Sequence, residues 1–351
     1  MAMILLSIGT KFTDFTPDLI FPETMMATWM VPIFSACIFV VPLLIFLKLI
    51  NKYKLGLVEL VKFLLGNFLG NIICLFLFLF SLIGTALLLN NYASILSTLY
   101  FNQSPKELFQ ILLAITCCLM ALGGAYGLGR TAWIVLPYVK FALLILIILT
   151  FTIELDISYL FPFFGKGIDV LVKESFLKNS IFIECFFLAT LVPFMKKSSD
   201  YSRAAIISLI IVAVEMSVFF IFYIIVFDAY ALTNMALPFQ HLTRTVNLGR
   251  FISNFEGYFL AFWIVGSLLK YAVYIYTTAL IFTQTLHVKS TKFHIFPVTI
   301  LVVLIGMVPE NAIRSSFLYR EYTLHVGSLF FVIFPFILWI LSIRKKVSVT
   351  L

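Results

Sequence analysis

Four ionisable side chains lie deep within long apolar runs of the sequence: Lys140, Glu184, Glu215 and Lys270. A charge at the centre of a bilayer costs about 2.5–3.5 kcal/mol to insert, so each needs a functional or a structural reason. One interpretation is a binding or coupling site, and the other is a buried ion pair that locks two helices together. We assign Lys140, Glu215 and Lys270 to intramembrane charge and coupling. Lys11 is a fifth such residue, beside a predicted helix break.

Lys270 must find an anion inside the protein, because an unpaired ammonium in an apolar environment is very unfavourable. Glu256 lies roughly 14 residues earlier, which is about 21 Å along a helix and too far for direct pairing. Glu184 and Glu215 are the acids that lie deep in other apolar runs. They are therefore the predicted partners of Lys270.

Gly9 and Thr10 interrupt the first apolar run and are followed by polar residues and Pro17. This pattern predicts an unwound point, where the N–H groups of a new helix start favour a carboxylate. Inverted-repeat transporters place such breaks in spans one and six. The sixth apolar run of this chain, near 176–195, carries Glu184. We therefore predict a site for a small zwitterion. Its candidate ligand-binding residues are Gly9, Thr10, Glu184, Tyr274 and Thr277.

No pattern for catalysis or metal binding is found. The cysteines all lie in apolar runs, as buried thiols do, and the histidines lie in separate connecting segments without metal-ligand spacing. The glycine-rich run at 123–129 lacks the strand and the Lys-Ser/Thr ending of a phosphate loop. Neither Ser/His nor paired-carboxylate arrangements occur at working spacing. We expect no enzyme, no metal and no cofactor.

The elements that position these residues must be membrane helices. Hydrophobic residues make up 62% of the chain and charged residues only 11%, with a mean hydropathy of +1.11. Soluble domains are about 45–50% apolar and about 25% charged, so a soluble protein is excluded. Backbone in hydrocarbon must satisfy its own hydrogen bonds, and the alternating pattern of a barrel is absent. The sequence therefore predicts an all-α integral membrane protein. The ten predicted spans are near 1–21, 25–50, 69–99, 106–124, 131–152, 176–195, 203–228, 253–286, 293–309 and 326–343.

The count of ten spans predicts one polytopic domain over 1–351, divided into two inverted repeats of five helices, 1–152 and 176–343. Spans one and six would be the broken helices. Span one is short as written, because only a few residues precede Gly9 and a full span needs about 20. Either the true start lies upstream, or the first half-helix is truncated in this chain.

The connecting segments alternate in charge, which predicts the orientation. Segments at 48–62, 130, 196–203, 289–292 and 344–346 are rich in lysine and arginine, with only Glu59 and Asp200 as acids. They are predicted to be cytoplasmic, as are both termini. The net charge of +8 is thus explained by topology and membrane lipid, without nucleic acid. A short amphipathic helix is predicted at 55–67 on the cytoplasmic membrane surface, and a short surface helix within 232–252.

The order of several motifs resembles the endospore germination permeases, the B subunits of spore germination receptors. Residues 237–270 include Glu256 followed by Trp263, Gly266 and Lys270 in a W-x-x-G-x-x-x-K stretch. Further matches are Gly124, Arg130 and Pro137, then Glu184 with Pro193, and Trp29 with Gly9-Thr10. Departures are Asn90 and Asn91, where charged residues are expected, and the ammonium of Lys140.

The resemblance implies the amino acid-polyamine-organocation transporter fold and nutrient sensing in the spore inner membrane. It implies a germinant such as an amino acid, an A-type membrane subunit and a C-type lipoprotein as partners. In some transporters of that superfamily a lysine in span five replaces a sodium ion. The resemblance implies the same role for Lys140. An amino acid/cation symporter of the same fold is the alternative, because fold does not decide function.

Overall fold

The computed structural model describes residues 1–246, 255–309 and 314–344, and within these ranges the regular structure is helical, without strands. The helices are α1 (Ala2–Gly9), α2 (Thr16–Thr24), α3 (Val31–Tyr53), α4 (Leu57–Leu65), α5 (Asn67–Ile95), α6 (Lys106–Ala121), α7 (Gly124–Thr150), α8 (Ile168–Leu177), α9 (Glu184–Phe187), α10 (Ser198–Phe227), α11 (Ala229–Leu232), α12 (Pro238–Thr245), α13 (Phe255–Thr285), α14 (Lys292–Gly306) and α15 (Glu321–Arg344). Short tight or irregular turns also matter below: η1 (Lys11–Thr13), η5 (Asn179–Phe182), η6 (Leu188–Phe194) and η7 (Arg314–Arg320).

Six helical segments of the described chain are long and apolar enough to cross a membrane: Thr16–Tyr53, Asn67–Tyr100, Gly124–Thr150, Ser198–Phe227, Glu256–Thr285 and Phe317–Arg344. This count is lower than the predicted ten, and the difference has a structural reason. The runs at 106–124 and 293–309 form helices of 16 and 15 residues, and the first and sixth runs are divided into shorter pieces. The fold is thus helical with several spans.

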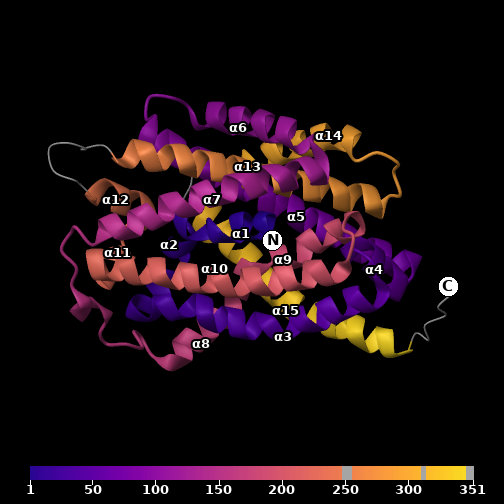
Figure 1. Ribbon diagram of the computed structural model, residues 1–351, viewed down its shortest axis with the longest axis horizontal. Coiled ribbons are helices and arrows are strands. Elements are labelled where there is room, and N and C mark those ends of the chain that lie inside the picture. Colours follow the sequence, from indigo (N-terminus) through magenta and orange to yellow (C-terminus); the bar gives the residue numbers. More distant parts are fainter. Residues whose placement is uncertain (247–254, 310–313, 345–351) are drawn as a thin grey trace.

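The two divided segments, which are the first and sixth runs near 1–21 and 176–195, lie at the centre of the bundle. The long helices lie around them (Figure 1). Helix α1 packs against α7, α10 and α13, and Ile4, Leu5, Leu6 and Ile8 are all buried. The outer helices instead expose large apolar side chains, including Trp133, whose exposed fraction is 65%. A hydrophobic exterior around a polar-containing interior is the arrangement expected of a protein with lipid as its solvent.

Helix α4 occupies the predicted 55–67 amphipathic helix, but its apolar face does not lie in lipid. Leu57, Val58, Leu60 and Val61 are fully buried, and the helix packs against α5. The Lys62 ammonium donates to the carbonyl oxygens of Gln284 and Thr285, 2.9 and 2.6 Å away, at the end of α13. A cation there is favoured by the helix dipole. Protein therefore covers the apolar face of this helix, and its position at the cytoplasmic membrane surface stays a prediction.

Candidate ligand-binding site

The first divided segment breaks where the sequence predicted, because α1 ends at Gly9 and α2 begins at Thr16. Side chains from other helices satisfy the carbonyl oxygens of the break. The Tyr223 hydroxyl donates to Phe12 O at 3.0 Å, and Gln240 of α12 donates to Thr13 O at 2.9 Å. The short helix predicted within 232–252 therefore exists as α12 and supports the break directly.

The second divided segment holds only four α-helical residues, α9, between the tight turns η5 and η6. Its Ile181 carbonyl oxygen accepts from the Lys11 ammonium at 2.5 Å. Lys11 also lies 2.8 Å from Glu184 Oε1, and both side chains are buried. A second bond to Glu184 comes from the Tyr274 hydroxyl of α13. Glu184 thus joins both breaks to α13.

Lys270 does not pair with Glu184 or Glu215, contrary to the sequence-based prediction. Its ammonium lies 3.5 Å from Asp14 Oδ2, and the Arg320 guanidinium lies 3.0 Å from Asp14 Oδ1. The prediction considered the glutamates deep in other apolar runs and passed over Asp14, which lies among the polar residues after the predicted break. The break instead carries Asp14 into the interior, where it is 4% exposed.

The partner of Glu215 is Lys140, so these two predicted coupling residues form an ion pair between α10 and α7. This pair lies against the first break. A Cβ atom placed on Gly9 would be 3.1 Å from Lys140 Nζ and 3.2 Å from Glu215 Oε2. Gly9 therefore permits close packing of α1 on the ion pair. A larger side chain at this position would displace the ion pair.

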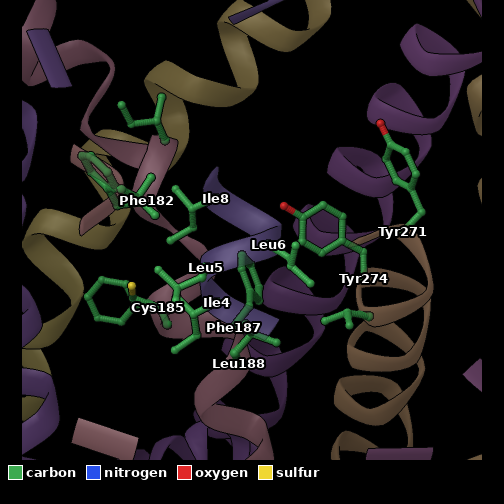
Figure 2. Close-up of a cluster of buried hydrophobic side chains, with 14 of the residues drawn as sticks. Ile4, Leu5, Leu6, Ile8, Phe182, Cys185, Phe187, Leu188, Tyr271 and Tyr274 are labelled. Carbon is green, nitrogen blue, oxygen red and sulfur yellow. The ribbon is translucent and has the colours of Figure 1, made fainter. Parts of the chain in front are cut away.

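Three of the five predicted ligand-binding residues, Glu184, Tyr274 and Thr277, line one cavity. We call this space, of about 450 Å³, the Tyr274 cavity. Its wall is largely apolar; the side chains of Phe80 and Phe187 lie on it. Figure 2 shows the neighbouring packing, with α1 between Phe182 and Cys185 on one side and Tyr271 and Tyr274 of α13 on the other.

A second space, of about 520 Å³, adjoins the first and contains more polar groups. We call it the Arg320 cavity, because Lys11, Glu184 and Arg320 all line it. The two cavities share Phe80, Gly84, Leu88, Ile183 and Glu184. Gly9 and Thr10 are not among the described residues that line either cavity.

Sequence reasoning did not assign Asp14, Gly84 or Arg320 to the site. Asp14 had a local signal, since it follows the predicted break closely, but Arg320 lies between the predicted spans near 293–309 and 326–343, outside the apolar runs. Gly84 is a glycine within a long helix whose Cβ position has open space around it. Only the folded chain shows that this space belongs to the two cavities.

Comparison with known proteins gives consistent matches. A family model described as "Spore germination protein" matches residues 1–314. Spore germination protein XB of Bacillus anthracis is 24% identical over 177 residues, which is 50% of this chain and 49% of that protein. The chain therefore spans about half the length of that relative. Spore germination protein A2 of Bacillus subtilis (strain 168) is 24% identical over 302 residues, 84% of this chain and 80% of that protein.

Proposed function

The chain belongs to the spore germination protein family, and from that premise we propose that it is the nutrient-sensing membrane subunit of a spore germinant receptor. It is a multi-pass membrane protein of a non-enzymatic family. The proposal places it in the spore inner membrane with both termini cytoplasmic. Its partners would be an A-type membrane subunit and a C-type lipoprotein, and its ten spans would form two inverted repeats, 1–152 and 176–343.

The observation that carries the proposal is the pair of adjoining cavities beside the second divided segment, of which the Arg320 cavity also reaches Lys11 and Thr16 of the first. Their walls combine buried charges with aromatic and aliphatic surface, as expected for a small molecule with an ionic end and an apolar end. Glu184 contacts Lys11 of one break and Tyr274 of α13. A ligand that changes the contacts of Glu184 would therefore act on both divided segments together.

The test is to fill the cavities from Gly84, whose added side chain meets no atom within 4 Å at its Cβ. Gly84→Leu should shift the amino-acid concentration for half-maximal germination upward at least tenfold, or abolish the response. Spores carrying the full receptor would be exposed to each of the twenty amino acids singly, with protein level measured by immunoblot. The matched control is Gly127→Leu, also an unobstructed helical glycine, which lines neither cavity. An unchanged dose-response for Gly84→Leu at normal protein level would contradict the proposal.

The second candidate function is amino acid/cation symport, and the Lys140–Glu215 pair is the observation that favours it. Both residues lie in membrane-spanning helices, and the Lys140 side chain is 29% exposed. Paired charges within membrane-spanning helices mark ion pathways and proton relays in pumps and transporters. Uptake of radiolabelled amino acid by proteoliposomes containing this chain alone would favour the symporter. Binding without uptake would favour the receptor.

A further inference from the structure

We propose that Arg320 is the recognition residue for a carboxylate, so that the ligand of the two cavities is an α-amino acid held by its carboxylate in the Arg320 cavity. This rests on the proposed function and specifies the chemistry of its ligand. Arg320 is 6% exposed and lies at the end of η7. Its Nη2 donates to Asp14 Oδ1 at 3.0 Å and to Thr16 Oγ1 at 2.6 Å.

The other terminal nitrogen, Arg320 Nη1, is buried and has no hydrogen-bond partner among the described residues. Guanidinium presents its donors in a planar fork that matches a carboxylate. A buried charged donor without a partner is rare in folded proteins and requires an explanation. Because Arg320 lines the cavity, a bound carboxylate is the explanation that the geometry supports.

The ion pairs also distribute the buried charges unevenly. Lys11 and Glu184 form one balanced pair, whereas Lys270 and Arg320 share the single carboxylate of Asp14. The nearby Asp18 accepts from Leu237 N–H and forms no ion pair within the described part of the chain. A ligand carboxylate would supply the missing anion for Arg320.

The remaining parts of an amino acid find matching groups in the adjoining Tyr274 cavity. Thr277 Oγ1 is buried without a hydrogen-bond partner in the described structure, and with Glu184 it offers acceptors to an ammonium. Phe80, Phe187 and Leu188 provide an apolar wall for a side chain of modest size. The ligand class is thus an α-amino acid with an uncharged side chain.

This placement differs from the carboxylate position predicted at the N–H groups after Gly9. The Thr10 N–H bonds to Ile8 O, and the Thr13 N–H lies 3.2 Å from Thr10 O. Those donors are already used within the break. Arg320 Nη1, in contrast, has no hydrogen-bond partner in the described structure.

The experiment compares an amino acid with its primary amide, which keeps the ammonium and side chain but removes the carboxylate. The full chain, purified in detergent, would first be screened with the twenty amino acids for a raised thermal unfolding midpoint. In the unaltered protein the amide of the best amino acid should bind at least tenfold more weakly. Arg320→Met should weaken binding of the acid at least tenfold and bring the acid and amide affinities within about twofold of each other. Arg320→Met should fold, because Asp14 keeps Lys270 as a partner.

Arg244→Lys is the control, since it alters a guanidinium paired with Glu256 away from both cavities. It should leave the ratio of acid to amide affinity unchanged. An Arg320→Met protein that retains the full preference for the acid would overturn the proposal. If that variant does not accumulate, equal stabilisation of the unaltered protein by acid and amide would overturn it instead. If the twenty amino acids all fail to bind the unaltered protein, the proposed function itself fails.

Discussion

Asp14 is the residue whose loss should destabilise this protein most, because one carboxylate satisfies two buried cations. Its Oδ1 accepts from Arg320 and from both the N–H and the hydroxyl of Thr16, while Oδ2 faces Lys270. Asp14→Asn leaves the geometry of the side chain nearly unchanged but removes the charge. Both cations would then remain buried without an anion.

The expected magnitude follows from these contacts. Removing one partner of a buried ion pair costs about 3–5 kcal/mol, since the other charge remains desolvated. Asp14→Asn affects two cations, so we expect a loss of about 5 kcal/mol or more in the free energy of unfolding. Lys270→Met should cost only about 0–1 kcal/mol, because Asp14 keeps Arg320 and one buried ammonium no longer needs a partner. The distances agree with this expectation, because Asp14 lies 3.5 Å from the Lys270 ammonium but 3.0 Å from the Arg320 guanidinium.

The assay is denaturant unfolding of the purified full chain in mixed micelles, with both single variants and the double variant. The double variant Asp14→Asn with Lys270→Met should be more stable than Asp14→Asn alone, because it strands one cation instead of two. Asp156→Asn, at an exposed carboxylate that accepts from Ser158 N–H, is the control for the loss of an acid. If Asp14→Asn proves no more destabilising than Lys270→Met, the shared-carboxylate reasoning is refuted.

Three further predictions concern the surroundings of the site. Gly9→Leu should lower the thermal unfolding midpoint more than Gly9→Ala, because its Cβ position already lies within 3.2 Å of the ion pair between α7 and α10; equal midpoints would contradict this. Trp263→Phe should cost about 1 kcal/mol in unfolding free energy, since it loses the 2.9 Å bond to Thr13 Oγ1 but keeps an aromatic ring; Trp263→Ala should cost about 3–5 kcal/mol in the same titration. Burial, with the neighbouring Arg244 cation, lowers the pKa of His241 from 6.5. A lowered pKa means that protonation disfavours the folded state, so stability present above pH 6.5 should fall as the pH drops below it, and His241→Gln should reduce this loss between pH 7.5 and 5.5.

Local signals were sufficient to predict the position of the first break and part of the site. Gly9, Thr10 and Pro17 are neighbours in sequence, and their backbone preferences act over a single turn. Glu184 was found because a carboxylate within an apolar run is conspicuous at any position in a fold. The same reasoning identified Lys140 and Glu215 as residues that need partners, although it did not pair them with each other.

The pairing of charges and the number of long helices could not be predicted from local patterns. Lys270 and Asp14 are 256 positions apart, and only the break brings Asp14 to the bundle interior. Hydropathy also cannot distinguish a continuous span from a divided one. The run at 176–195 is apolar along most of its length, yet after α8 ends at Leu177 only Glu184–Phe187 is α-helical within it. Its carbonyl oxygens find partners on other helices, which sequence periodicity does not reveal.

The hydrogen bonds and ion pairs that hold the first break have a consequence for the order in which segments join the bundle during synthesis. Phe12 bonds to a residue 211 positions later, and Asp14 to one 306 positions later. At about 5–20 residues per second, the ribosome needs roughly 15–60 s to reach Arg320 after it has made Asp14. Lys11 lacks Glu184 for the first part of that interval and Asp14 lacks Arg320 for all of it, and unpaired charges are held out of hydrocarbon. The segment synthesised early is therefore expected to settle in the bundle late, after α13 and η7 have been inserted beside it.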